Sequence, residues 1–201
     1  FFAVHHGQAE SDGFNRLTGG TSGSANSALV PNNAMALSQN IVITRPNGRG
    51  FITAYNPADG KELWRFNTIP SPGDPGSETW KGDAWKTGGG PIWTTGSYDP
   101  ELNLTYWGVG NPGPDFNPDQ RPGDNLYSDS VVALDPDTGA LKWHFQFSPH
   151  DPYDYDSVQI GVLADLNWKG TPTKAILWGN RNGFFYVLDR TNGKFLSATP
   201  F

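Results

Sequence analysis

One short motif recurs along this chain and constrains its fold more than any other feature. In the clearest copy, residues 133–143, an apolar run ends at Asp135, Gly139 follows four residues later, and Trp143 four residues after that. A weaker copy occupies residues 54–64 and a degraded one residues 187–197. Glycine supplies the positive φ that a tight hairpin needs, and an aromatic side chain at a fixed offset is typical of stacked β-blades. The copies predict a repeat protein built from β-hairpins.

Composition favours the same all-β fold. The 201 residues include 25 Gly, 17 Pro and 8 Trp but only 17% charged residues, which favours short strands and turns over long helices. The net charge of -6 argues against nucleic-acid binding. We find no apolar stretch long enough to span a membrane and no signal peptide. The absence of cysteine excludes disulfides and thiolate metal sites.

The chain divides at about residue 40. Residues 1–40 are rich in small polar residues, and we expect a poorly structured or unassigned arm there. In residues 41–201, apolar runs alternate with turns, and three motif copies predict about three four-stranded blades of a β-propeller. Propellers close with about four to eight blades, so we expect other blades or copies to complete this one. Two Gly- and Pro-rich insertions, 69–90 and 111–127, separate the repeats.

Seven further motifs give the chain a family resemblance over residues 48–201. In order they are RGF at 49–51, WKGDAWK at 80–86 followed by GGG, YDP at 98–100, GVGNP at 108–112, RPGDN at 121–125, HDPYDYD at 150–156 and RNG at 181–183. In this order they resemble the quinoprotein alcohol dehydrogenases, the methanol and ethanol dehydrogenase family that depends on pyrroloquinoline quinone (PQQ). The resemblance implies an eight-bladed propeller with PQQ and a calcium or lanthanide ion on its axis. It also implies a periplasmic enzyme that oxidises a small alcohol and passes electrons to a cytochrome c-type acceptor.

The resemblance assigns roles to five residues. Trp93 matches the tryptophan on which the flat quinone lies, and Arg181 matches the arginine that stabilises negative charge on the quinone oxygens. Asp154 matches the base that accepts the proton of the alcohol. Asn111, Asp154 and Asp156 match oxygen ligands of the metal ion. Calcium-dependent methanol dehydrogenases generally have a small residue in place of Asp156 and lanthanide-dependent ones have Asp, although more distant members also carry Asp.

One departure keeps a second interpretation open. Ungapped alignment places Arg45 where the family has a glutamate metal ligand, and a cation cannot fill that role. Either the alignment has a gap here, or the chain has lost this ligand, or the segment before Gly48 was replaced or misread. Together with the count of three blades, this departure leaves a non-catalytic β-propeller scaffold, or an inactive fragment of such an enzyme, as the alternative. Asp124 and Asp129 are interpreted as turn or blade-structure residues.

Overall fold

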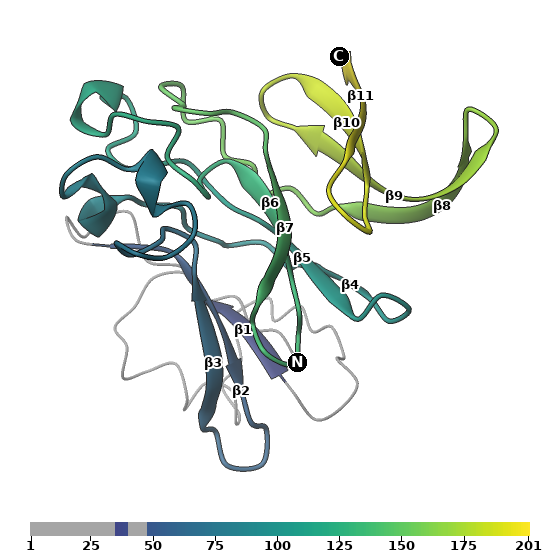
Figure 1. Ribbon diagram of the computed structural model, residues 1–201, viewed down its shortest axis with the longest axis horizontal. Helices are drawn as coiled ribbons and strands as arrows, with labels where there is room; N and C mark the ends of the chain where they lie inside the picture. The colour runs from purple at the N-terminus through teal and green to yellow at the C-terminus, as the bar shows by residue number, and fades with distance from the viewer. Residues whose placement is uncertain (1–34, 40–47) are drawn as a thin grey trace, which may run out of the picture.

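The computed structural model describes residues 35–39 and 48–201, which form three antiparallel sheets (Figure 1). The first sheet joins, in order, β1 (Met35–Gln39), β2 (Phe51–Tyr55) and β3 (Glu62–Asn67). The second joins β4 (Ser97–Asp99), β5 (Leu104–Gly108), β6 (Ser130–Leu134) and β7 (Leu141–Gln146). The third joins β8 (Val162–Trp168), β9 (Thr171–Asn180), β10 (Phe184–Asp189) and β11 (Phe195–Pro200). The all-β prediction is confirmed.

Among the described residues, helical structure is confined to the two insertions. It consists of three 3-10 turns, η1 (Ser77–Thr79), η2 (Ala84–Thr87) and η3 (Pro118–Gln120). Over residues 35–39 and 48–201, no helix has the length and apolar character needed to cross a membrane.

The first sheet begins earlier than the sequence predicts. β1 lies within residues 1–40, the segment assigned to an arm, and its backbone pairs with β2 from Met35 opposite Tyr55 to Gln39 opposite Phe51. Strand pairing across the sheet, rather than local composition, brings this polar-flanked segment into the fold. The strand expected at 41–43 lies outside the described residues.

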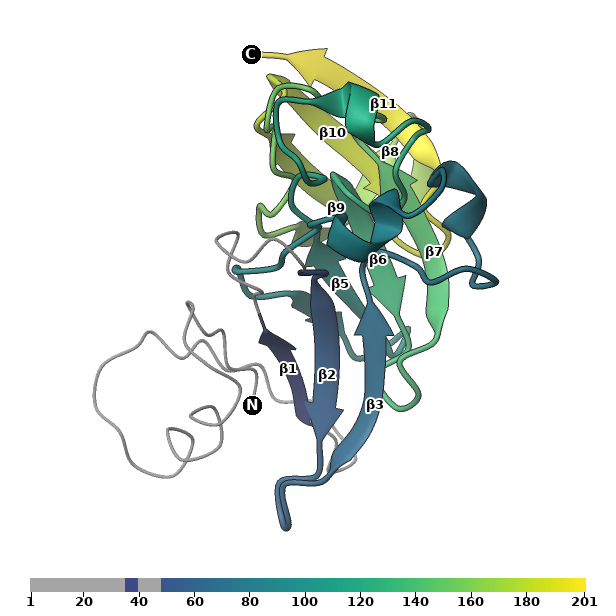
Figure 2. The ribbon, with the colours of Figure 1, turned by 90° about the vertical axis from the view of Figure 1, so that its left-hand side faces the viewer.

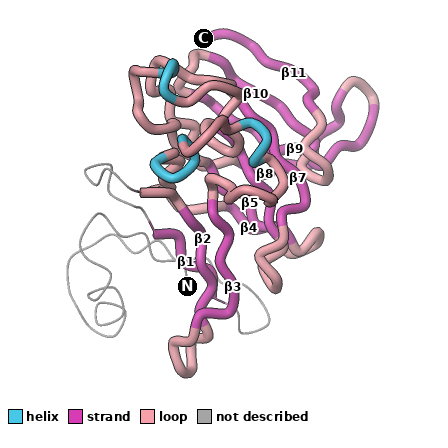
Figure 3. The backbone as a smooth tube through the Cα atoms, turned by 60° about the vertical axis from the view of Figure 1, so that its left-hand side comes forward, coloured by secondary structure: helices cyan, strands magenta, loops and turns pink. Residues whose placement is uncertain are grey.

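Each sheet is an up-and-down meander, so its connections alternate between two ends. One end carries short turns, at 56–61, 100–103, 135–140, 169–170 and 190–194. The opposite end carries the long connections 68–96, 109–129 and 147–161, together with the β9–β10 turn at 181–183. Figure 3 shows these long loops and the helical turns gathered at one end of the strands.

Trp64, the last residue of the first motif copy, joins the first sheet to the second. Its Nε1–H donates to the carbonyl of Pro136 at 3.0 Å, in the β6–β7 turn. A Cβ on Gly139 of that turn would come within 2.5 Å of the Trp64 ring, so the indole rests directly on the glycine. Figure 2 shows β3 beside the β6–β7 hairpin.

Trp143 repeats this contact between the second sheet and the third. Its Nε1–H donates to the carbonyl of Arg190 at 3.1 Å, and a Cβ on Gly193 would come within 2.6 Å of its ring. In both contacts the accepting carbonyl lies three residues before the turn glycine. The repeated spacing in the sequence therefore records a contact between neighbouring blades.

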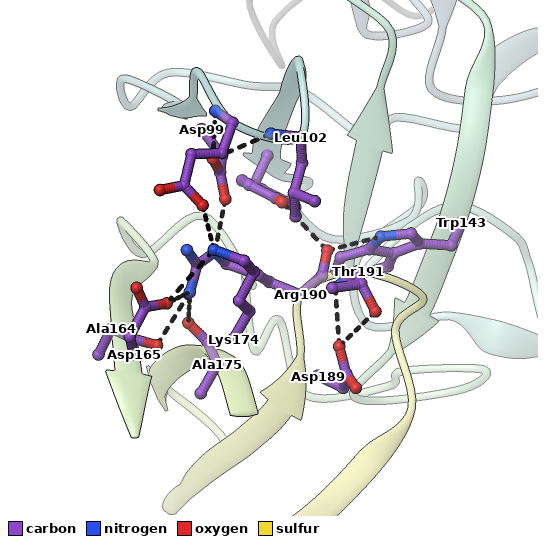
Figure 4. A network of polar contacts seen from close by, with 12 residues as sticks. Asp99, Leu102, Trp143, Ala164, Asp165, Lys174, Ala175, Asp189, Arg190 and Thr191 are labelled. Carbon is purple, nitrogen blue, oxygen red and sulfur yellow. Dashed lines mark hydrogen bonds and ion pairs between the residues drawn. The ribbon is translucent and has the colours of Figure 1, made fainter. Parts of the chain in front are cut away.

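Arg190 supports the second of these contacts through both its guanidinium and its carbonyl group (Figure 4). Its guanidinium pairs with Asp99 of β4 at 2.6 Å and with Asp165 of β8 at 2.8 Å, while its carbonyl accepts from Trp143 and from the hydroxyl of Tyr106 at 3.0 Å. Burial alone would raise the pKa of Asp99, but hydrogen bonds from Arg190 and two backbone N–H groups hold that pKa below its usual value. The network ties β4, β8 and the β10–β11 turn together.

Apolar side chains fill the spaces between the sheets in two clusters. Between the first and second sheets lie Ile52, Ala54, Ile92, Trp107, Val109, Tyr127, Val132 and Leu134. The second cluster, between the second and third sheets, contains Tyr106, Val131, Trp143, Phe147, Ile176, Trp178, Tyr186 and Leu188 among its members. Burial of these side chains supplies the main driving force for stacking the blades.

The indole–glycine contact predicts the effect of adding one methyl group. Gly139 and Gly170 both have positive φ, 71° and 89°, but a Cβ on Gly170 would meet nothing within 4 Å. Gly170→Ala should therefore cost only backbone strain, about 1 kcal/mol. Gly139→Ala should cost about 3 kcal/mol, because it also pushes against the Trp64 ring. Equal losses in denaturant unfolding of the two variants would contradict the proposed contact.

Candidate functional site

The connections at one end of the strands, three long and one short, carry all five residues that the sequence singles out. Trp93 comes from the β3–β4 connection and Asn111 from the β5–β6 connection. Asp154 and Asp156 come from the β7–β8 connection, and Arg181 from the β9–β10 turn. The meander topology brings these connections to the same end of the sheets.

Arg181 bridges the two candidate carboxylates. Its Nη1 donates to Asp156 Oδ2 at 2.7 Å, and its Nη2 lies 3.8 Å from Asp154 Oδ2. About half of the Arg181 side chain is exposed, whereas the Asp156 side chain is largely buried. The guanidinium therefore holds two acidic groups close together while its outer edge faces solvent.

Asn111 is buried beside Asp156, and its amide orientation is fixed. Its backbone N–H donates to Asp156 Oδ1 at 3.1 Å. Its Nδ2 donates to Asp115 Oδ1 at 2.6 Å and to the carbonyl of Pro112 at 3.2 Å. Its Oδ1 is a buried acceptor without a hydrogen-bond partner. Leaving such an oxygen unpaired costs free energy, so the position suits a ligand that binds oxygen.

Gly110 lets Trp93 approach the acidic pair. A Cβ on Gly110 would come within 2.8 Å of the Trp93 ring and within 3.0 Å of Asp156 Oδ1. Only glycine therefore fits between the indole and the carboxylate. The backbone N–H of Gly110 donates to the carbonyl of Pro91 at 2.8 Å, which fixes the segment that leads to Trp93.

Asp151 holds the backbone of the acidic loop, the segment 151–156 that carries Asp154 and Asp156. Asp151 is buried, and its carboxylate accepts from the backbone N–H of Tyr153 at 2.8 Å and of Tyr155 at 2.7 Å. Asp154 and Asp156 adopt positive φ, 63° and 32°, which is uncommon for residues other than glycine. These hydrogen bonds hold a strained backbone that presents two carboxylates at one place.

The electrostatics of the site favour a bound cation. Burial is the main cause that raises the pKa of Asp156 to about 6, and the neighbouring Asp154 adds to the shift against the opposing hydrogen bond from Asn111. Burial and the charge of Asp115 likewise raise the pKa of Asp154, although Arg181 opposes them. A cation would relieve this repulsion and stabilise both anions.

The donor set suits a hard metal ion. It comprises the unpaired amide oxygen of Asn111 and the carboxylates of Asp154 and Asp156, and oxygen donors of this kind bind calcium and lanthanides. Within the described ranges 35–39 and 48–201, no cluster of three His, Cys, Asp or Glu side chains forms a metal site, and the candidate set contains two carboxylates and one amide oxygen. Arg45, at the position of the family's glutamate, lies outside the described residues.

The sequence assigned no role at the site to three residues that lie near it. Asp115 orients the amide of Asn111, and Arg121 is completely buried beneath the loops. Asp129, interpreted from sequence as a turn or blade-structure residue, is also fully buried, and neither of its carboxylate oxygens has a hydrogen-bond partner. The RPGDN motif at 121–125 contains Arg121 but gave no role for it, and no motif contains Asp115 or Asp129.

Comparison with known proteins decides the family. Residues 11–199 match the PQQ family described as the glucose/ethanol/alcohol dehydrogenase β-propeller domain. The chain belongs to this PQQ β-propeller family. The prediction of a propeller of the quinoprotein alcohol dehydrogenase type is confirmed, and the match extends into residues that the sequence assigned to an arm.

Several members of the PQQ β-propeller family are similar to this chain. The quinoprotein alcohol dehydrogenase PedH of Pseudomonas putida is 48% identical over 76% of this chain and 28% of its own length. The lanthanide-dependent methanol dehydrogenase of Methylorubrum extorquens is 41% identical over 75% of this chain and 28% of its own length. The solved structure of the quinohemoprotein alcohol dehydrogenase ADHIIG of Pseudomonas putida HK5 superposes with a TM-score of 0.78 at 41% identity. That superposition covers 86% of this chain and 27% of the other. The chain thus spans about a quarter of the length of these relatives.

Asp129 predicts an unusual dependence of stability on pH. Burial, with the nearby carboxylates of Asp151 and Asp156, raises its pKa to about 9 from an ordinary value of 3.8. The fold favours the neutral carboxyl of Asp129. Its contribution to the free energy of unfolding is therefore fully present below pH 3.8 and is lost as the pH rises towards 9. Asp129→Asn stays neutral, so its free energy of unfolding relative to the parent should rise by on the order of 2–4 kcal/mol between about pH 5 and pH 8.

Denaturant unfolding at the two pH values measures this difference. Asp119→Asn is the matched control, because Asp119 is exposed on η3. The control should change stability equally at both pH values. If the stability of Asp129→Asn relative to the parent is the same at pH 5 and pH 8, as for the control, Asp129 is ionised in the fold and the prediction is wrong.

Proposed function

We propose that this chain supplies the metal-binding and quinone-binding face of a PQQ-dependent alcohol dehydrogenase, with Asp154 as the base. The observation that carries the proposal is the unpaired buried Oδ1 of Asn111 beside the carboxylates that Arg181 holds together. Membership of the PQQ β-propeller family supports the same assignment. Because the chain spans about a quarter of the relatives' length, the activity of the whole protein is part of the proposal.

Alcohol oxidation removes a proton from oxygen and a hydride from carbon. A bound PQQ would supply the two-electron acceptor for that hydride, and a bound metal ion would act as a Lewis acid on it. Asp154 would accept the hydroxyl proton, since its raised pKa brings it closer to the working pH of a general base. Its partial exposure leaves the carboxylate open to substrate.

Trp93 and Arg181 would orient the cofactor. The indole of Trp93 offers a broad rigid face, and the absence of a side chain at Gly110 lets that indole lie close to Asp156. Arg181 uses Nη1 on Asp156, and its half-exposed guanidinium retains donors for negative charge that develops during reaction.

Asp156 bears on which metal ion binds. Asp156 adds a second carboxylate next to Asp154, and more anionic oxygen favours a trivalent ion over calcium. A relative that is 41% identical is a lanthanide-dependent methanol dehydrogenase. We therefore propose a lanthanide ahead of calcium. The periplasmic location and the cytochrome c-type acceptor remain predictions from family resemblance.

Removing the proposed base should abolish turnover. Asp154→Asn keeps the size of the side chain but cannot accept the alcohol proton, so kcat for alcohol-dependent dye reduction should fall by about a hundredfold or more. The measurement uses the full protein supplied with PQQ and with calcium or a lanthanide in parallel. Asp119→Asn, an exposed acid on the neighbouring connection, should keep the parent's rate.

The same assay tests the competing interpretation. A parent protein that reduces no dye with any alcohol under either metal would identify the chain as a non-catalytic scaffold or an inactive fragment. Full activity of Asp154→Asn would remove Asp154 as the base while leaving alcohol oxidation in place.

Asp156 should select between ions. Asp156→Ala removes one anionic ligand, so it should weaken lanthanide binding by about tenfold more than it weakens calcium binding. Isothermal titration of the full protein with each ion measures both affinities. Equal weakening of the two ions would show that Asp156 does not discriminate by charge.

A further inference from the structure

We propose that Arg121 is a positioning residue that fixes the spacing between the two loops carrying the candidate metal ligands. The inference rests on the proposed function and deepens it. Arg121 opens the RPGDN motif at 121–125, to which the site described above gives no role.

The hydrogen bonds of Arg121 go to carbonyl oxygens rather than to carboxylates. The residue is completely buried. Its guanidinium donates to four carbonyl groups: Pro114 at 3.0 Å, Asp115 at 3.1 Å, the Asn125 side chain at 2.9 Å, and Asp151. Arg190, the other buried arginine of the described residues, instead pairs with two carboxylates. A buried guanidinium that donates to loop carbonyls fixes the backbone positions of those loops, which is a different role from pairing with a carboxylate.

On one side, Arg121 fixes the backbone of the β5–β6 connection just after Asn111. It holds the carbonyls of Pro114 and Asp115. The Asp115 side chain accepts from Asn111 Nδ2 at 2.6 Å, which leaves the amide oxygen as the free, buried acceptor. A shift of the Asp115 main chain would therefore turn the amide of Asn111.

On the other side, Arg121 controls the acidic loop. Its Nη2 donates to the main-chain carbonyl of Asp151. The carboxylate of Asp151 holds the backbone that presents Asp154 and Asp156. One guanidinium thus reaches both sets of candidate ligands through a single residue on each side, Asp115 and Asp151.

Asn125 holds the guanidinium in place. Its Oδ1 accepts from Arg121 Nη1 at 2.9 Å, and its Nδ2 donates back to the Arg121 carbonyl at 2.9 Å. Asn125 has a φ of 61°, which asparagine and glycine tolerate best. Lysine in place of Arg121 would keep the charge but would lose the rigid fork that reaches several acceptors at once.

Terbium luminescence sensitised by tryptophan, in the full protein without PQQ, measures metal affinity independently of turnover. Arg121→Lys should weaken terbium binding by about tenfold or more, as is typical when residues that support metal ligands are changed. Arg190→Lys is the matched control, since it makes the same change at a buried arginine of the blade contact. It should lower the melting temperature but keep terbium affinity within about twofold of the parent.

Asn125→Gly is a second variant that tests the same role if Arg121→Lys does not fold. Glycine accepts the φ of 61° but removes the acceptor for Arg121 Nη1, so terbium binding should weaken by about threefold. Parent-like terbium affinity in both variants, or in Asn125→Gly alone if Arg121→Lys does not fold, would overturn the positioning role. Absence of terbium binding by the parent protein would instead overturn the proposed metal site, and the role of Arg121 with it.

Discussion

The fold depends on one repeated contact, in which the indole of one blade lies on the turn glycine of the next. Trp64 and Trp143 make this contact with the same geometry, and each also donates a hydrogen bond to the carbonyl three residues before the glycine. The contact combines the burial of a large apolar ring with a satisfied polar edge, which suits tryptophan better than any other residue. It fixes the position of each sheet relative to its neighbour and so determines where the connections meet.

Local patterns in the sequence predicted the hairpins but not the partners of their aromatic residues. A glycine four residues after an Asp or Asn indicates a turn, and this physics is local. The acceptor of Trp64, Pro136, lies 72 residues further on, at a separation that no local pattern encodes. The pairing of β1 with β2 was missed for the same reason, because composition alone suggested an arm.

The candidate site shows a similar division. Trp93, Asn111, Asp154, Asp156 and Arg181 were assigned by family resemblance, and the structure brings these five residues to one end of the sheets. The supporting residues Asp115, Arg121 and Asp129 were not assigned, because their contacts run between irregular loops whose course no periodicity predicts. Family motifs identify residues that touch ligands more readily than residues that hold those residues in place.

Backbone strain and unpaired polar groups gather around the same loops. Non-glycine residues with positive φ include Asn125, Asp129, His150, Asp154 and Asp156, all in the β5–β6 and β7–β8 connections. The unpaired oxygens of Asn111 and Asp129 lie in the β5–β6 connection. Departures from local preference persist only where the surrounding structure enforces them. In this chain, the loops are anchored at both ends by the stacked sheets, which hold these conformations in place.

The separation of short turns from long loops has a consequence for how such a protein changes over time. The indole–glycine contacts lie at one end of the strands, while the connections 68–96, 109–129 and 147–161 leave from the other. Insertions and deletions in those connections do not alter the register of the blades. A lineage can therefore change these connections one by one while inheriting the scaffold unchanged, so the two ends of one sheet are free to evolve at different rates.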